Sequence, residues 1–186
     1  MATKEMVSTA LFTKYPIKNI LVYNGITISH YILGGIGIIL GYDFTELAYL
    51  FGALYLLFAF GQMYVLMPLM VCPNCVYYRL NNSRCTTALN IFSKKIIKEG
   101  SADNFPNRAK GLFCHNNMYM AALLIPIVAM IPALVVNFSL SLLTIFFGVI
   151  GLLFFRIFVV FQKIACVHCR AMNVCPNAQA MGLTSK

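Results

Sequence analysis

Long apolar runs alternate with short polar segments along most of this chain. Four runs approach the roughly 20 helical residues that cross the core of a bilayer, and they occupy residues 20–42, 47–70, 118–136 and 140–164. The turns within each pair, residues 43–46 and 137–139, allow only tight hairpins between antiparallel helices. The pattern predicts an all-α integral membrane protein, a four-transmembrane-helix bundle made of two hairpins.

The apolar runs divide the chain into five parts. We expect an N-terminal arm at residues 1–19, a first transmembrane hairpin at 20–70, a cysteine-containing segment at 71–117, a second hairpin at 118–164 and a cysteine-containing tail at 165–186. Of the 186 residues, 60% are hydrophobic and only 10% are charged, whereas a soluble domain carries about 25% charged residues. This composition excludes the soluble, disordered and fibrous classes.

The positive charges lie mainly on one side of the predicted four-helix bundle. Only Arg156 of the 14 lysines and arginines lies well inside a predicted helix, and neither hairpin turn contains a cation. The positive-inside rule therefore predicts that both termini and a cysteine-rich cap lie on the cytoplasmic side. The net charge of +9 then reflects this orientation and contact with anionic membrane lipids. No nucleic acid is expected as a partner.

Part of the middle segment has helical periodicity. Leu89, Phe92 and Ile96 fall at i, i+3 and i+7, lysines lie between them, and Gly100 is a stop signal. These features predict a short amphipathic helix. It lies either at the membrane surface with its cations toward the headgroups, or against another subunit.

The second and fourth apolar runs both lead into a CxxC motif. One motif begins at Cys72, 20 residues after Gly52, and the other begins at Cys166, 18 residues after Gly148. Each motif is followed by one further cysteine. This matched placement predicts a parallel internal repeat of hairpin plus cysteine segment.

All seven cysteines lie on the side of the predicted bundle that carries the positive charges. A cytoplasmic location keeps thiols reduced, which favours metal binding or redox chemistry over structural disulfides. The predicted metal ligands form two trios, namely Cys72, Cys75 and Cys85, and Cys166, Cys169 and Cys175. Either the two CxxC pairs close one shared four-sulfur site, or each trio forms its own site. In the second case Cys114, His115 and His168 are the additional candidate ligands.

The predicted metal is either an iron–sulfur cluster or zinc. Zinc accepts four thiolates as a structural staple, but a single zinc leaves Cys85, Cys114 and Cys175 unexplained. The tail sequence CVHCRAMNVCPNA resembles the close of a bacterial ferredoxin run, although one cysteine is absent and the spacing is one residue short. These points favour an iron–sulfur cluster. No haem is expected, because His30 has no second histidine at membrane depth.

The ionisable residues His30 and Arg156 lie well inside the predicted spans. For His30 we expect a neutral ring in a helix contact, with a quinone or lipid headgroup as the alternative partner. Arg156 is expected to snorkel to the interface. The alternative is a position inside the bundle near Gln62, where it would neutralise a bound anion or a reduced cluster. A glycine-rich face that includes Gly34 and Gly41 predicts close packing of the first helix.

The predicted function is that of a small membrane subunit of a redox complex. Its cysteines would relay electrons between a cytoplasmic partner and a membrane acceptor such as a quinone. A zinc-stapled assembly subunit without catalysis and a soft-metal transporter or chaperone are the alternatives, followed by a thiol–disulfide enzyme. The chain has five acidic residues, which is too few general acid–base groups to favour a self-contained hydrolytic enzyme.

Overall fold

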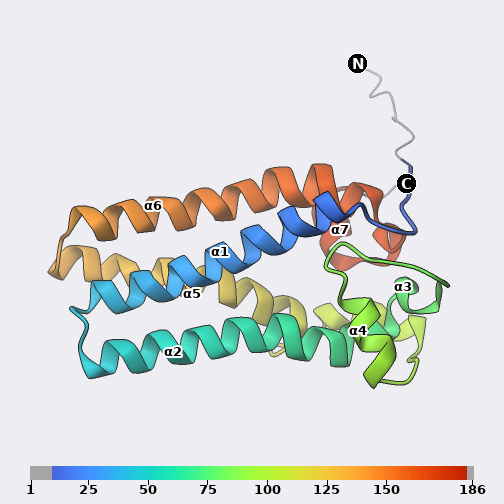
Figure 1. Cartoon of the computed structure of the whole chain (residues 1–186), viewed down its shortest axis with the longest axis horizontal. Helices are drawn as coiled ribbons and strands as arrows, with labels where there is room; N and C mark the ends of the chain where they lie inside the picture. The colour runs from blue at the N-terminus through green and yellow to red at the C-terminus, as the bar shows by residue number, and fades with distance from the viewer. Residues whose placement is uncertain (1–9, 184–186) are drawn as a thin grey trace, which may run out of the picture.

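Four long helices make up most of the molecule. The computed structural model describes residues 10–183, which are helical apart from turns, loops and two isolated backbone bridges. Four helices are long and apolar enough to cross a membrane, namely Ile17–Gly41, Glu46–Asn74, His115–Val136 and Leu140–His168. They run side by side along the long axis of the molecule (Figure 1). The predicted all-α, four-span architecture is therefore confirmed.

The second and fourth spans share an unusual construction. The first and third are single α-helices, α1 (Ile17–Gly41) and α5 (His115–Val136). The other two begin as α-helix, continue as π-helix and close with a 3-10 turn. Their parts are α2 (Glu46–Phe60), η1 (Gly61–Val71) and η2 (Cys72–Asn74), and α6 (Leu140–Phe155), η4 (Arg156–Ala165) and η5 (Cys166–His168). π-Helical segments are rare and occur frequently at functional sites, and here both lead directly into a CxxC motif.

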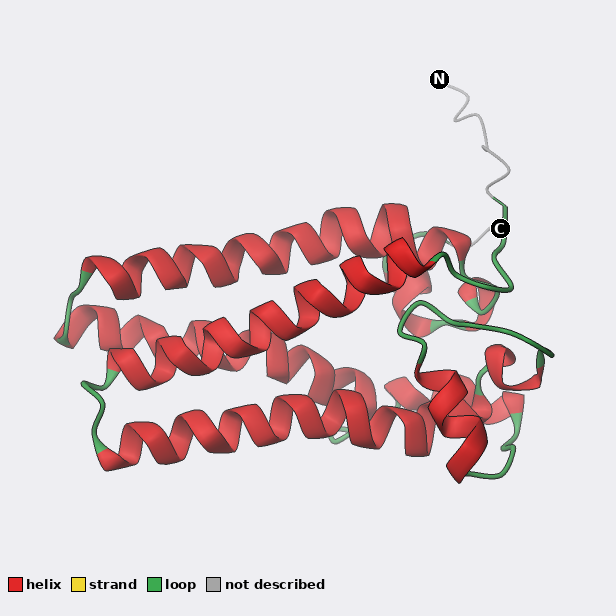
Figure 2. Cartoon of the chain, in the orientation of Figure 1, coloured by secondary structure: helices red, strands yellow, loops and turns green. Residues whose placement is uncertain are grey.

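Short helices cover one end of the bundle. They are α3 (Val76–Arg79), α4 (Leu89–Ile96), η3 (Ala102–Ala109), η6 (Met172–Val174) and α7 (Pro176–Ala180). Both ends of the described chain lie at this end, and the α1–α2 and α5–α6 turns lie at the other (Figure 1). The longer loops between helices also lie at the end with the short helices (Figure 2). We call the two cysteine-bearing segments at this end, residues 72–85 and 166–175, the cysteine rim.

Helix α1 contacts each of the other three long helices, through α2, α5 and α6. A Cβ atom on Gly34 would lie 2.8 Å from both Pro126 Cβ and Tyr55 Oη, and one on Gly41 would lie 2.7 Å from Ala133 Cβ. These separations are too short for a side chain. The glycine-rich face therefore lets the neighbouring helices approach α1 closely, as small residues do in membrane helix pairs.

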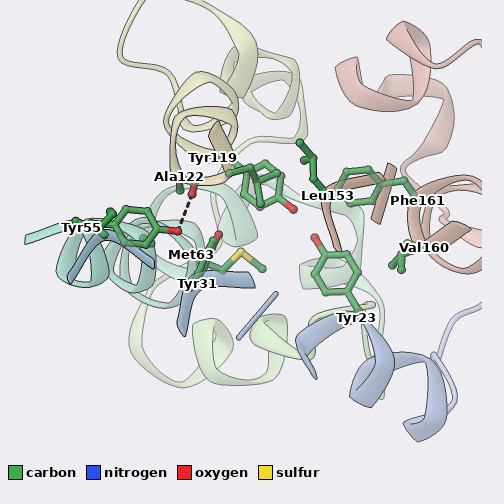
Figure 3. Packing of buried hydrophobic residues seen from close by; sticks show 13 residues of the cluster. Tyr23, Tyr31, Tyr55, Met63, Tyr119, Ala122, Leu153, Val160 and Phe161 are labelled. Carbon is green, nitrogen blue, oxygen red and sulfur yellow. Dashed lines mark hydrogen bonds between the residues drawn. The ribbon is translucent and has the colours of Figure 1, made fainter. Parts of the chain in front are cut away.

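The bundle interior is rich in tyrosine. Figure 3 shows Tyr23, Tyr55 and Tyr119 in one buried cluster, in which the Tyr55 hydroxyl donates a hydrogen bond to the Ala122 carbonyl at 3.0 Å. Apolar side chains face outward instead, and Leu57 is 71% exposed. An apolar exterior is what lipid-facing helices need, while the buried Tyr55 hydroxyl finds a backbone partner inside.

The predicted amphipathic helix of the middle segment is α4, which ends at Ile96 rather than near Gly100. Its buried side is polar, because Asn90 donates to the Ser83 carbonyl at 3.1 Å and Ser93 donates to the Pro68 carbonyl at 2.7 Å. Phe92 and Ile96 remain exposed. The polar side of α4 therefore fixes the helix to the first cysteine segment and to η1.

Candidate functional site

Six cysteines line one cavity at the cysteine rim. The cavity has a volume of about 130 Å³, roughly ten times the ~10–15 Å³ that one water molecule requires. Its walls include all six predicted ligands, Cys72, Cys75, Cys85, Cys166, Cys169 and Cys175. Every one of these thiols is free of a disulfide. The tertiary structure thus brings the two trios, which are far apart in the sequence, around a single space.

The two CxxC motifs adopt the same local geometry. In each, the backbone N–H of the second cysteine donates to the carbonyl of the first at 3.1 Å, and the pairs are Cys75 with Cys72 and Cys169 with Cys166. A second turn follows in each motif. The Tyr78 N–H donates to the Cys75 carbonyl at 2.9 Å, and the Met172 N–H donates to the Cys169 carbonyl at 3.0 Å. Both motifs therefore curve in the same way at the edge of the cavity.

Burial determines the protonation of the two cysteines that lie just beyond the spans. It raises the pKa of Cys75 to about 12 and the pKa of Cys169 to about 11. The backbone N–H two residues later, that of Tyr77 or Ala171, lowers the pKa and partly offsets this effect. Cys169 also raises the pKa of Cys75, so thiols from the two halves influence each other. A bound metal would have to displace these protons.

The N-terminal arm joins the two cysteine segments. The Phe12 N–H donates to the His168 carbonyl at 3.0 Å, and the Arg84 N–H donates to the Thr13 carbonyl at 3.1 Å. The Tyr15 N–H returns a hydrogen bond to the Arg84 carbonyl at 2.9 Å. The arm therefore bonds to one segment beside Cys169 and to the other beside Cys85, a role that its polar sequence did not indicate.

Tyr77 strengthens the same junction. Its hydroxyl donates to the Phe12 carbonyl at 2.8 Å and accepts a hydrogen bond from the Arg170 N–H at 3.3 Å. The ring is 1% exposed and lines the cavity. Its position two residues after the first CxxC was the one available signal in the sequence, and the prediction did not use it.

Two basic side chains also line the cavity. Arg108 Nε and His115 Nδ1 are buried and have no hydrogen-bond partner among the described residues. The Arg108 guanidinium lies 5.4 Å from the centre of the Phe105 ring, and its charge lowers the pKa of Cys75. His115 was a predicted additional ligand. Arg108 was not singled out, because nothing in its local sequence distinguishes it from the other cations of the middle segment.

The remaining two candidate ligands do not line this cavity. Cys114 is the N-cap of α5, where its sulfur accepts a hydrogen bond from the Asn117 N–H at 3.4 Å, and it lines a neighbouring cavity. The His168 ring stacks on Phe12 with 4.5 Å between ring centres, and its Nδ1 lies 3.0 Å from the Ala10 carbonyl oxygen. These two side chains are engaged in folding contacts, so the site consists of six cysteines with His115 beside them.

The sulfurs surround the cavity without converging on one point. Among residues 10–183, no group of three histidine, cysteine or acidic side chains is close enough together to hold a single metal ion. The cysteines therefore stand as separate groups on the walls of a shared space.

The two ionisable residues of the spans are both buried. His30 is 0% exposed and its Nε2 lies 3.0 Å from the Leu123 carbonyl oxygen, which is the predicted helix contact. The prediction that Arg156 snorkels is wrong, because this side chain is 1% exposed and donates to the Thr27 hydroxyl at 2.7 Å. The partners that hold it inside the bundle come from other helices. At this depth neither residue contacts bulk lipid.

In comparisons with known proteins, no family model, curated protein or solved structure matches this chain.

Proposed function

We propose that this chain is a small integral-membrane electron-transfer subunit whose cysteine rim holds an iron–sulfur cluster. The observation that carries the proposal is the gathering of six cysteines from both halves around one cavity of about 130 Å³. Iron–sulfur clusters are held by cysteine thiolates. Electron transfer also agrees with the scarcity of other reactive groups, since the chain has only five acidic residues and three histidines.

Six cysteines around one cavity favour a cluster over a single zinc ion, which takes only four thiolates. A zinc ion with four Zn–S bonds of about 2.3 Å requires its sulfurs to stand within about 4 Å of one another. Residues 10–183 contain no such convergent group. A cluster takes one thiolate for each iron and fills the space between them with its own atoms. Cysteines on the walls of a cavity suit this second arrangement.

The two halves of the chain are proposed to be a parallel repeat that builds one shared site. Both composite spans pass from π-helix to a 3-10 turn at the CxxC motif. The 3.1 Å hydrogen bond that closes the motif is the same in both halves. A duplicated hairpin that contributes one trio to each side of a common cavity accounts for this symmetry.

The cysteine rim is proposed to face the cytoplasm, with lipids around the spans and other subunits of a membrane complex as partners. Support comes from the cations at the rim end and their absence from both hairpin turns. Electrons would pass from a cytoplasmic donor through the cluster to a membrane acceptor. A quinone is the proposed membrane acceptor, although His30 itself is buried in a helix contact.

A zinc-stapled assembly subunit is the second candidate. The arm that bonds to both cysteine segments, through Thr13 on one side and Phe12 on the other, favours a mainly structural rim. In that case zinc would hold the two hairpins together and carry no electrons.

A soft-metal transporter has one feature in its favour and one against it. Met63 and Met67 line the cavity, and thioether sulfur suits soft cations. However, Arg156 is buried in the fourth span against rings that also line this cavity. A fixed positive charge at that depth opposes the passage of a metal cation.

Anaerobic purification of the full-length protein tests the proposal. We expect a brown protein with broad absorption near about 400 nm, iron and acid-labile sulfide, and an electron-spin signal after reduction with dithionite. A colourless protein with stoichiometric zinc would support the zinc staple and overturn the electron-transfer proposal. Cys114→Ser is the matched control, because serine is also a good N-cap and Cys114 lies outside the cavity.

Single-cysteine variants distinguish one shared site from two. If the site is shared, Cys75→Ser and Cys169→Ser each abolish nearly all cluster binding. If each trio holds its own centre, each variant removes about half of the iron and leaves the other centre intact.

Orientation is tested separately by labelling intact cells with a membrane-impermeant maleimide, in a background with all native cysteines replaced by serine. Asp43→Cys in the α1–α2 turn should be labelled from outside, and Lys110→Cys at the rim end should be protected. The reverse result would overturn the cytoplasmic placement of the rim.

A further inference from the structure

Arg156 is a buried positive charge held by aromatic rings. Its guanidinium carbon lies 4.9 Å from the ring centres of Tyr23 and Tyr119, and 5.4 Å from that of Phe161. One nitrogen donates to the Thr27 hydroxyl at 2.7 Å, whereas Nε and Nη2 have no hydrogen-bond partner among the described residues. Cation–π contacts and one neutral hydroxyl hold the side chain in place without neutralising its charge.

No carboxylate in the described chain compensates this charge. Asp43 and Glu46 lie at the far turn, and Glu99 forms the one ion pair of residues 10–183, with Arg79. Asp103 is exposed beside Ser101. A buried cation without a counter-ion is costly in a membrane. The buried charge therefore points to an anionic partner that is not among residues 10–183.

The cavity of the cysteine rim is where such a partner would be near Arg156. Tyr23, Tyr119 and Phe161, the three rings that contact the guanidinium, also line that cavity. Figure 3 shows the Tyr23 and Tyr119 hydroxyls pointing toward one another beside Phe161. A layer of aromatic side chains thus lies between a fixed positive charge and the space that the cysteines surround.

We infer that Arg156 is a buried counter-charge of an anionic, thiolate-bound centre in this cavity, in addition to Arg108 on the cavity wall, and that it raises the reduction potential of this centre. The inference rests on the proposed function, because it needs a redox-active cluster. One-electron reduction by dithionite adds one negative charge to the cluster, and a fixed positive charge nearby stabilises that reduced form. Arg156 touches neither the cysteines nor the reacting atoms, so its role is electrostatic tuning.

The experiment compares the reduction potential of the anaerobically purified, cluster-loaded protein with that of two variants. Arg156→Met removes the charge, whereas Thr27→Asp places a carboxylate against the guanidinium and neutralises it without removing the side chain. In both variants we expect the ratio of reduced to oxidised cluster at a fixed potential to fall about tenfold, which for one electron is a shift of about 59 mV to lower potential.

Two further variants keep the positive charge and serve as controls. Arg156→Lys retains the charge, and Thr27→Val removes the hydrogen bond but leaves the guanidinium in place. Both should keep a potential close to that of the unmodified protein. A purely structural role would instead reduce the cluster content or the thermal stability and leave the potential of the remaining cluster unchanged.

The possible failures are distinguishable. If Arg156→Met does not fold, Thr27→Asp still tests the charge. A loaded protein whose potential is unchanged in the charge-neutralising variants overturns this inference and leaves the proposed function standing. A protein that carries no iron–sulfur cluster overturns the proposed function and this inference with it.

Discussion

The guanidinium of Arg156 donates a hydrogen bond to the hydroxyl of Thr27 at 2.7 Å, across 129 residues of sequence. Both side chains are buried, at 1% and 0% exposure. The contact ties α1 to the π-helical part of the fourth span, at a point where a charged group has no water to bind. Its loss is therefore expected to affect the stability of the bundle.

Replacing Thr27 by valine should destabilise the protein, because it leaves one more charged N–H group buried without a partner. We expect the free energy of unfolding to fall by about 1.5–3 kcal/mol. Thermal unfolding in detergent measures the effect. Thr144→Val is the control, since the exposed Thr144 hydroxyl donates only to the Leu140 carbonyl of its own helix. Equal effects of the two substitutions would contradict the importance of the buried contact.

Helix α1 should respond very differently to a methyl group at two of its glycines. Gly34→Ala places a Cβ 2.8 Å from Pro126 and Tyr55, and we expect a loss of about 1–3 kcal/mol from overpacking. At Gly25 nothing lies within 4 Å of the added Cβ, so alanine should stabilise the helix by about 0.5–1 kcal/mol. A comparison of the unfolding temperatures of the two variants with that of the unmodified protein tests both expectations. A neutral Gly34→Ala variant would argue against the close approach of α5 and α2 to α1.

Metal binding at the rim should strengthen as the pH rises. Cys75 and Cys169 have pKa values of about 12 and about 11, so both thiols are protonated at neutral pH and each must lose a proton to bind a metal. The apparent affinity for Zn²⁺, measured by competition with a chelator, should rise about tenfold per pH unit for each proton released. An affinity that does not change between about pH 6 and 8 would contradict these thiols as ligands.

The stability of the metal-free protein should change with pH in the opposite direction. Because burial raises both pKa values above the ordinary 9.0 of a thiol, the native state retains protons that the unfolded state releases. The resulting stabilisation is complete below about pH 9 and is lost progressively as the pH rises toward 11 and 12. Unfolding by denaturant at several alkaline pH values measures this loss, and replacing both cysteines by serine should reduce it.

Removing the Tyr77 hydroxyl should loosen the rim. Tyr77→Phe leaves the Phe12 carbonyl and the Arg170 N–H without their partner, and because both hydrogen bonds are only partly buried, we expect a cost of about 0.5–1.5 kcal/mol. Faster loss of bound metal to a chelator is the expected result. Tyr78→Phe is the matched control, because the Tyr78 hydroxyl bonds to the Ile97 carbonyl and this residue does not line the cavity. If the two variants release metal at the same rate, the junction through Phe12 is not what holds the rim.

Several features of the fold follow from local sequence alone. The four spans are predictable because a backbone in lipid must satisfy its own hydrogen bonds, so an apolar run of sufficient length can only be a helix. The glycine-rich face of α1 was predictable for a related reason, since small residues are where membrane helices approach closely. The two cysteine trios were likewise predictable from the spacing of the cysteines along the chain.

The tertiary structure decided how these parts meet. Whether the trios share one cavity depends on the packing of the second and fourth spans and on the arm at Phe12 and Thr13, and none of this leaves a periodic signal in the sequence. The snorkelling prediction for Arg156 failed for the same reason. Snorkelling follows from helix position alone, whereas the buried conformation depends on Tyr23, Tyr119 and Thr27 of two other helices.

Hydropathy and motif spacing are properties of neighbouring residues, and they determined the membrane class, the number of spans and the identity of the candidate ligands. The environment of a buried charge or thiol is set by side chains that are distant in the sequence and become neighbours only when the helices pack. Only the tertiary structure therefore shows that the two trios share a cavity, that Arg108 lines this cavity and that Arg156 is buried.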